Sequence, residues 1–204
     1  MAIKFQYNKT SLQLLEKQLK VRVRALPTIK NKESALRIEV KKSKDEFKAL
    51  TTRLENEIAY YESMFPLWSE FDPSLVKVLD VHMETAKFAG VRLPKFTGID
   101  FEVQPFSLFN NPKWFIEGIE LLKRLAKMGI EQEFAYMKLT LLERARKKTT
   151  QKVNLFEKVQ IPGYQDAIRK IKRFMEDEEN LSKSSQKILK SRQEAQKKTE
   201  EVGV

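Results

Sequence analysis

The sequence predicts a mainly α-helical protein, in which two long helices pair as an antiparallel coiled coil and a small middle segment contains a short β-hairpin. Three observations support this fold class. The chain is rich in charge, with 33% Asp, Glu, Lys and Arg, and has only six glycines. Apolar residues repeat at heptad spacing towards both ends, and prolines gather between them. Chains that bury one narrow stripe have this balance of charged and apolar residues.

The overall composition narrows the class of protein. With 41% hydrophobic and 10% aromatic residues, the chain is too apolar to be disordered. The 39 Lys and Arg exceed the 28 Asp and Glu by 11, so an acidic partner is expected: nucleic acid, an anionic membrane face or an acidic protein cavity. The absence of cysteine excludes disulfides and thiolate metal sites and fits a reducing cytosol. No signal peptide and no run of about 20 apolar residues is recognisable, so we expect membrane association only through partners.

The first predicted domain, residues 1–63, is one long helix that starts near residue 10. Apolar residues recur there at alternating steps of three and four for about seven heptads, as in a coiled-coil seam. The predicted seam positions are Leu12, Leu15, Leu19, Leu26, Leu36, Val40, Phe47, Leu50, Leu54 and Ile58. Pro27 predicts a kink, because it removes a backbone hydrogen bond, but the seam resumes in phase beyond it. We interpret three polar seam residues as setting the register at a cost in stability: Arg22, Glu33 and Ser43.

The second predicted domain, residues 64–113, interrupts the helical pattern. Five of the seven prolines lie in it, and such a density ends long helices. Residues 76–78 and 80–88 are predicted to be extended, with a turn at Gly90. Residues 99–103 alternate apolar and acidic side chains, as a half-buried strand does. We therefore predict a small β-hairpin, with nearby aromatic side chains available for burial: Phe106, Phe109, Trp114 and Phe115.

The third predicted domain, residues 114–204, is a second long helix with a basic tail. Its predicted seam positions are Phe134, Leu141, Phe156, Ile168, Ile171 and Met175. The pattern slips near Pro162, which predicts a stutter in the supercoil. The last dozen residues are polar and basic and are expected to fray. Neither long helix can bury its seam alone, so we predict that the two pair antiparallel.

The sequence offers little catalytic chemistry. His82 is the one histidine, and we expect it to be a solvated or hydrogen-bonded strand residue without a catalytic companion. The acidic run at residues 176–179 occupies four successive helix positions, which point in different directions and do not converge on a metal ion. No glycine-rich phosphate loop is present. We therefore predict no catalytic, cofactor-binding or metal-binding residue.

Two alternatives follow from the basic composition alone. A basic coiled coil could bind nucleic-acid backbones without sequence preference. It could also be a free-standing scaffold that pairs with itself. The basic tail lacks the stacking aromatics of single-strand binders, which favours a solvated or protein-binding tip over a nucleic-acid site.

Two stretches of the chain are more specific than its composition. The first begins as Asn-Lys-Thr-Ser-Leu at residues 8–12 and continues through Leu15, Leu19, Leu26, Lys30, Lys32, Glu33 and Leu36. The second reads Lys-Val-Asn-Leu-Phe-Glu-Lys-Val-Gln-Ile-Pro at residues 152–162 and is followed by Ala-Ile-Arg-Lys-Ile at 167–171. Together they resemble the D subunit of V-type and A-type rotary ATPases over residues 8–60 and 115–182. Pro27 and Gly163 depart from that pattern.

The resemblance implies a non-catalytic central-stalk component, which transmits torque between a catalytic head of A and B subunits and a membrane ring that translocates H⁺ or Na⁺. It implies an F subunit beside the axle, a socket protein of the C or d type beneath residues 62–113, and a cytoplasmic, membrane-peripheral location. Cofactors, nucleic acid and direct membrane insertion are not expected. The charged faces of residues 1–50 and 165–198 are expected to contact the head. The candidate contacts are Lys9, Lys17, Lys20, Arg24, Arg169, Lys172, Arg173, Lys183, Lys187 and Lys190.

Overall fold

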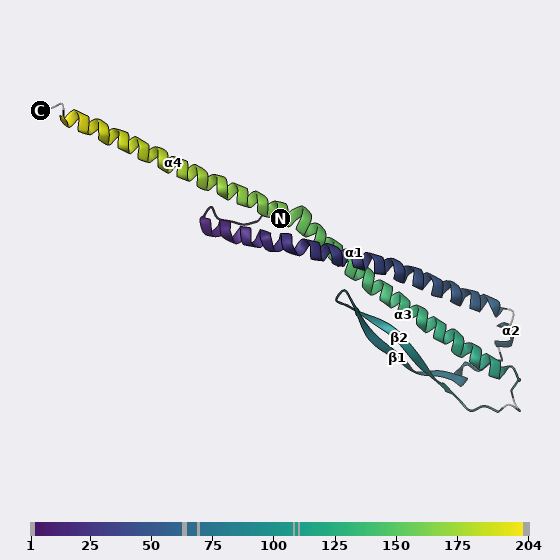
Figure 1. Ribbon diagram of the computed structural model, residues 1–204. Coiled ribbons are helices and arrows are strands. Elements are labelled where there is room, and N and C mark those ends of the chain that lie inside the picture. Colours follow the sequence, from purple (N-terminus) through teal and green to yellow (C-terminus); the bar gives the residue numbers. More distant parts are fainter. Residues whose placement is uncertain (1–2, 63–64, 69, 108, 110, 202–204) are drawn as a thin grey trace. The chain divides into compact units, whose positions relative to one another are not determined.

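The computed structural model describes residues 3–62, 65–68, 70–107, 109 and 111–201. It confirms the mainly α fold class, with a small two-stranded antiparallel sheet in the middle of the chain (Figure 1). In chain order the elements are α1 (Lys9–Tyr60), α2 (Phe65–Trp68), η2 (Pro73–Leu75), β1 (Val76–Phe88), β2 (Val91–Val103), α3 (Phe115–Asn154), η3 (Leu155–Gln160) and α4 (Ile161–Glu201).

Contacts divide the chain into two compact units. Unit 1 contains Met1–Lys30 and Gln151–Val204, and unit 2 contains Asn31–Thr150. Each unit combines a part of α1 with a part of the C-terminal helices. The domains predicted from the sequence, with boundaries at residues 63 and 113, are instead three consecutive segments of the chain. α1 continues through Pro27 as one helix.

Unit 1 is held together by an apolar seam between α1 and α4. Its buried members are Leu15, Tyr164, Ala167, Ile168 and Ile171, with Leu12, Leu19 and Met175 half-buried against them. In α4, Ala167 and Ile168 each lie three or four residues from both Tyr164 and Ile171, so the four side chains share one face of the helix. The ion pairs Glu16–Lys172 (2.9 Å) and Lys30–Glu157 (2.7 Å) run in opposite order along the two helices, which makes the pair antiparallel.

The residues before α1 fold back against α4 within unit 1 (Figure 1). The ring of Tyr7 lies 4.8 Å from that of Phe174. A Cβ atom at Gly163 would come within 3.2 Å of Ile3. Gly163, which departs from the family pattern, thus provides the flat surface on which Ile3 packs.

A π-helix, η3, joins α3 to α4 immediately before Pro162. The N–H of Ile161 donates to the carbonyl of Phe156, five residues earlier. Pro162 has no N–H to donate, so an α-helix would lack one backbone hydrogen bond at this position. The wider π-helical turn therefore lies where the α-helix is already interrupted. This turn contains one residue more than an α-helical turn, which accounts for the slip of the apolar pattern near Pro162.

Arg22 occupies a seam position in unit 1 and makes three contacts there. Its Nε donates to Oε1 of Gln160 (2.8 Å), and a guanidinium N–H donates to the carbonyl of Gln18. The guanidinium carbon lies 4.4 Å from the centre of the Tyr164 ring, a cation–π arrangement. These partners compensate for the charge that Arg22 brings into the seam.

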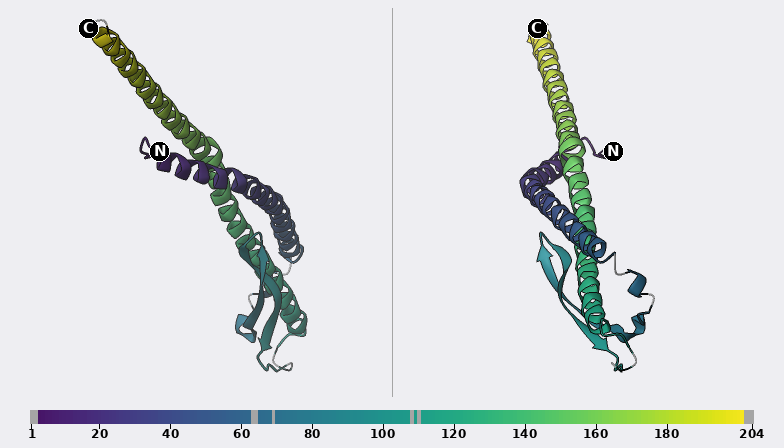
Figure 2. Two further views of the ribbon diagram at one scale, coloured as in Figure 1. Left: turned by 60° about the vertical axis from the view of Figure 1, so that its left-hand side comes forward. Right: turned by 90° about the vertical axis from the view of Figure 1, so that its right-hand side faces the viewer.

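In unit 2, α1 pairs with α3, and the hairpin packs on this pair (Figures 1 and 2). The pairing is again antiparallel, because Glu33 contacts Thr150 (3.1 Å) while Thr51 contacts Gln132 (3.1 Å). The buried cluster comprises Leu36 and Val40 of α1, Leu139 and Leu142 of α3, and Leu93 of β2. Leu93, only 4% exposed, anchors the hairpin to both helices.

The hairpin turn consists of Ala89 and Gly90, with φ angles of 46° and 78°. A two-residue hairpin turn of type I′ requires positive φ at both positions. The turn predicted at Gly90 is therefore present. The strand predicted at residues 99–103 is the end of the longer β2, which also contains Pro94. A two-stranded sheet accommodates this proline because the outer edge of β2 needs no partner.

An aromatic cluster closes the other end of unit 2. It comprises Phe71, Leu75, Phe115 and Ile119, with Trp68, Val76, Phe106, Trp114 and Leu122 half-buried around them. Asp72 caps the short helix η2 by accepting a hydrogen bond from the backbone N–H of Ser74 (2.9 Å). Hydrogen bonding to Ser74 holds the pKa of Asp72 below its usual value. Three of the four predicted aromatics lie in this cluster, whereas Phe109 is fully exposed, at 101%.

Two glycines of α3 are expected to respond oppositely to alanine. A Cβ at Gly118 would lie 3.0 Å from Trp114 and 3.2 Å from Phe71, both packed rings, so Gly118→Ala should lower the free energy of unfolding by about 1–3 kcal/mol. A Cβ at Gly129 would meet nothing within 4 Å, so Gly129→Ala should raise it by about 0.5–1 kcal/mol. Urea unfolding of both variants measures this difference. Equal stabilisation by the two changes would contradict the packing described for Gly118.

Ser43 of α1 is 1% exposed, and its hydroxyl has no hydrogen-bond partner among the described residues. A buried hydroxyl without a partner costs stability. We expect Ser43→Ala to raise the free energy of unfolding by about 1 kcal/mol, measured as a higher urea midpoint at unchanged slope. Ser43→Thr, which keeps the hydroxyl, should give no gain. A destabilised alanine variant would mean that the hydroxyl is satisfied in solution.

Candidate partner-binding surfaces

The predicted seam residues differ in burial. Buried are Leu15, Leu36, Val40, Ile168 and Ile171, and half-buried are Leu12, Leu19, Leu26, Phe47, Leu50, Leu54, Phe134, Phe156 and Met175. Exposed are Ile58, at 43%, and Leu141, at 38%.

Three of these positions do not have the contacts expected of a seam. Leu142, not Leu141, is buried against α1, because neighbouring helix residues point about 100° apart. Phe134 lies against Phe96 of the hairpin, with ring centres 5.7 Å apart. Near Ile58, the contacts between the helices are polar instead: Arg124 of α3 binds Glu57 (3.2 Å) and the hydroxyl of Tyr61 (2.7 Å).

The basic residues predicted to contact a partner all lie in unit 1, and all ten are exposed. Three form ion pairs: Lys172 with Glu16, Arg169 with Asp166, and Lys183 with Glu179. The hydrogen bond and charge of Lys183 hold the pKa of Glu179 below its usual value. The other seven have no ion-pair partner in the described part of the chain: Lys9, Lys17, Lys20, Arg24, Arg173, Lys187 and Lys190.

α4 continues well beyond its contacts with α1 (Figure 1). Every residue from Glu176 to Ala195 is exposed, whereas Met175 still packs against the unit 1 core. Leu181, Ile188 and Leu189 are 69%, 53% and 59% exposed. The helix extends to Glu201 and so includes most of the last dozen residues, which the sequence predicts to fray. A helix that buries none of its apolar side chains gains little stability by itself, and this stretch is therefore a candidate binding surface.

A second apolar surface lies around the aromatic end of unit 2. Its exposed members are Leu67, Leu79, Val103, Phe109 and Ile116, which are between 36% and 101% exposed. They belong to the segment expected from the sequence to meet a socket protein, or directly follow it. The sequence signal was the density of aromatic residues, which did not distinguish the buried Phe115 from the exposed Phe109.

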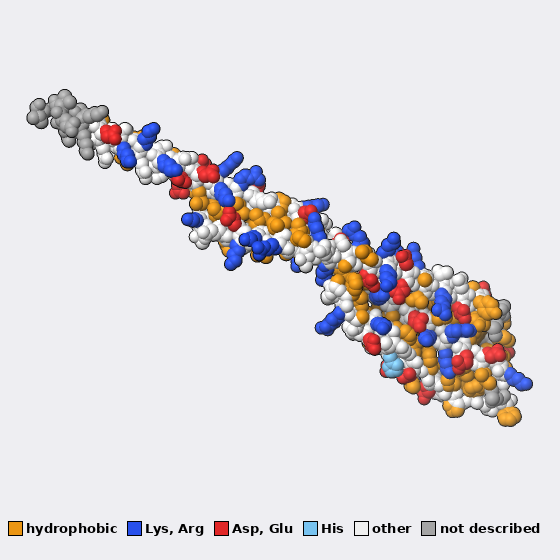
Figure 3. All heavy atoms as spheres, viewed as in Figure 1, with side chains coloured by type: hydrophobic (Ala, Val, Ile, Leu, Met, Phe, Trp, Pro, Cys, Tyr) orange, Lys and Arg blue, Asp and Glu red, His pale blue; other side chains and the backbone are white. Residues whose placement is uncertain are grey.

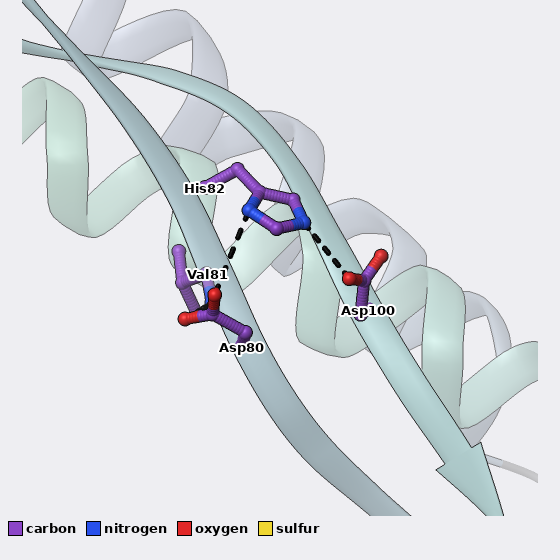
Figure 4. A network of polar contacts seen from close by, with 4 residues as sticks. All are labelled: Asp80, Val81, His82 and Asp100. Atoms are coloured by element: carbon purple, nitrogen blue, oxygen red, sulfur yellow. Dashed lines mark hydrogen bonds and ion pairs between the residues drawn. The ribbon is translucent and has the colours of Figure 1, made fainter.

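His82 has polar companions that the sequence does not predict. Its Nε2 lies 2.8 Å from a carboxylate oxygen of Asp100, and its Nδ1 lies 3.6 Å from one of Asp80 (Figure 4). Asp80 and Asp100 are opposite each other in the strand register, which brings both carboxylates to one side chain. The three side chains are at least half exposed, and His82 is visible at the surface in Figure 3. We interpret the group as a solvated strand contact.

The described residues contain no group of three or more His, Asp or Glu side chains placed to hold a metal ion. Within the same residues, no helix is long and apolar enough to cross a membrane.

Comparison with known proteins gives these surfaces a context. A family model for the ATP synthase D subunit matches residues 11–191. The chain belongs to the ATP synthase D-subunit family. The V-type ATP synthase D subunit of Borreliella burgdorferi is 31% identical over 195 residues, which cover 92% of this chain and 94% of that protein. The D subunits of the V-type ATP synthases of Chlamydia pneumoniae and Chlamydia muridarum are 27% and 25% identical. The first match covers 97% of both chains, and the second covers 94% of this chain and 97% of that protein. The resemblance seen in the sequence is thereby confirmed.

Proposed function

We propose that this D-subunit protein is the central-stalk axle of a V-type ATP synthase and transmits torque between the catalytic head and the membrane ring. The observation that carries the proposal is the part of α4 that packs against no other helix, residues Glu176–Glu194, which we call the unpaired part of α4; its exposed side chains are both basic and apolar. An axle that turns inside a ring of proteins needs such a projecting element. Long-range charge attraction lets it interact with several sites in turn without locking to one.

The seam of unit 1 suits the transmission of torque. Its buried side chains interdigitate, and relative rotation of two such helices has to displace close-packed groups. Arg22 adds a polar contact across the same seam. The proposed role is mechanical, so no group of this chain takes part in ATP chemistry.

The proposed orientation follows from the two candidate surfaces. The ten candidate contact residues of unit 1 and the unpaired part of α4 face the A and B subunits of the head. The apolar surface around Phe109 and Leu67 meets a socket protein of the C or d type, because exposed apolar patches commonly mark protein interfaces. The F subunit binds beside the axle. The complex sits on the cytoplasmic side of the membrane, and this chain inserts no segment into the lipid.

Purification of the native complex tests the proposal. A tagged chain, expressed in its own host, should retain the A, B and F subunits and ATP hydrolysis activity. A self-assembled homodimer without these proteins would favour a free-standing scaffold instead. Retention of the purified chain on duplex DNA, released by salt, would favour a nucleic-acid-binding rod.

A further inference from the structure

Five residues of the unpaired part of α4 share one side of the helix, and we call them the tail stripe. At successive steps of three, four, three and four positions, they are Glu178, Leu181, Ser185, Ile188 and Arg192. This spacing places side chains above one another on a helix surface. All five are exposed. In chain order the tail stripe is acidic, apolar, small, apolar and basic.

The two apolar side chains of the tail stripe are open to water. Leu181 and Ile188 are 69% and 53% exposed. Seven positions are close to two full turns of an α-helix, so both side chains point in nearly the same direction. Ser185 lies between them, and its small side chain leaves room for an apolar side chain of another helix. The tail stripe can therefore bury its apolar surface only against a second helix.

The charged ends of the tail stripe lack partners within the chain. Glu178 and Arg192 form no ion pair among the residues that the structure describes, and neither does Asp177, the neighbour of Glu178. No residue three or four positions from Glu178 or Arg192 carries the opposite charge, so neither can form the usual local pair of a helix surface. The two ends are themselves about 21 Å apart along the helix. Each end can therefore pair only with a charge on another molecule.

We propose that the tail stripe of the free chain pairs antiparallel with the tail stripe of a second copy. The order acidic, apolar, small, apolar, basic is complementary to itself when it is reversed. A twofold axis near Ser185 places Glu178 opposite Arg192 of the second copy, and Leu181 opposite Ile188 of the second copy. Because the interface is symmetric, each contact occurs twice.

The charges select both the direction of the pair and its occupant. A parallel pair would place each charged end beside its own like charge, which is repulsive. A uniformly acidic protein surface would attract Arg192 but repel Glu178 and Asp177. The antiparallel pair spans residues 178–192. It lies beyond Met175, the last residue of α4 in the unit 1 core, so α1 keeps its contacts.

The pairing goes beyond the proposed function and bears on assembly. It concerns the chain before it joins other proteins, and it covers the stretch proposed to enter the head. Its consequence for assembly rests on the proposed function: a paired chain has to separate before it enters the head. The second copy shields Leu181 and Ile188 until head proteins replace it.

The first test is sedimentation equilibrium of the purified full-length chain at several concentrations. We expect a monomer–dimer equilibrium whose dissociation constant rises with salt, because the end contacts are ionic. Leu181→Ala/Ile188→Ala should raise this constant by about tenfold or more, since it removes the apolar contacts of both copies while alanine keeps the helix. The control Leu14→Ala/Ile38→Ala, which alters two exposed residues of α1, should leave it unchanged.

The second test exchanges the charges of the two ends. Asp177→Arg/Glu178→Arg makes both ends basic, and Arg192→Glu makes both ends acidic, so each variant alone should be monomeric. An equimolar mixture of the two should pair as tightly as the unaltered chain, because opposite charges then face each other at both ends. Lys148→Glu, an exposed position outside the tail stripe, is the control and should pair normally. Circular dichroism should show the same helicity for every variant.

The outcomes separate this pairing from the proposed function. A chain that stays monomeric at every concentration would overturn the pairing, and so would a dimer that both the alanine and the charge variants leave intact. Addition of the A and B head subunits should separate the dimer. A monomeric chain that still joins the head would overturn the pairing and leave the proposed function standing. A dimer of the expected charge dependence that binds no head protein would support the pairing and refute the proposed function.

Discussion

Leu142→Ala is expected to lower the free energy of unfolding of the chain by about 2–5 kcal/mol. Leu142 is 0% exposed and belongs to the buried cluster that also contains Leu36 of α1 and Leu93 of the hairpin. Its truncation removes apolar contacts and leaves a cavity that three elements would have to close together. Because Leu93 shares this cluster, the hairpin should also become easier to detach. Urea unfolding followed by circular dichroism measures the first effect, and hydrogen exchange of the β1 and β2 amides measures the second.

The matched control for this prediction is Leu141→Ala. Leu141 is 38% exposed, so its truncation should change the free energy of unfolding by about 0.5 kcal/mol or less. The two variants remove the same atoms from neighbouring positions of one helix, and only their orientation differs. If Leu141→Ala proved the more damaging, the seam of α3 would follow the sequence pattern and not the packing described above.

Ending the chain after Met175 is expected to separate folding from function. Met175 is the last residue of α4 in the unit 1 core, and residues from Glu176 to Ala195 are exposed. The shortened chain should therefore keep its unfolding midpoint within a few degrees, since residues 176–195 of the removed segment are all exposed. Within the complex, however, it should reduce coupled ATP hydrolysis by at least tenfold, because the element proposed to enter the head is gone.

A milder variant distinguishes the apolar from the basic contribution of this stretch. Leu181→Ala/Ile188→Ala/Leu189→Ala keeps the helix, because alanine favours it, and keeps every charge. We expect partial loss of assembly from this variant and full loss from the truncation. Full activity of the truncated chain in a purified complex would remove the unpaired part of α4 from the mechanism.

The elements of the fold were largely predictable because their signals are local. Heptad spacing from Leu12 onward indicates a helix with one buried stripe, and Gly90 between two extended runs indicates a hairpin turn. Pro27 predicts a kink, and the seam that resumes in phase beyond it indicates that the helix continues, as α1 does. The position of a helix stripe, by contrast, depends on its neighbours. Leu141 fits the heptad pattern of α3, yet the hairpin and α1 together select Leu142 for burial.

The candidate surfaces were only partly predictable, because exposure depends on long-range packing. Basic residues are evident from the sequence. The ion pairs of Arg169 and Lys183 are local to α4, whereas the pair of Lys172 with Glu16 depends on the pairing of α1 with α4. The contact between His82 and Asp100 depends on strand register, which cannot be read from either strand alone. Gly163 likewise stands out in the sequence only as a departure from the family pattern, whereas the packing of Ile3 against it gives the small residue a role.

The most direct test of the axle is a reversible cross-link between this chain and the catalytic head. The chain contains no cysteine, so Ile188→Cys introduces a single thiol at a position that is 53% exposed. In the assembled complex, with a second cysteine placed on the facing surface of a head protein, oxidation should join the two chains. Continuous ATP hydrolysis should then stop, and reduction should restore it. A complete cross-link that leaves hydrolysis unchanged would show that this chain does not turn within the head.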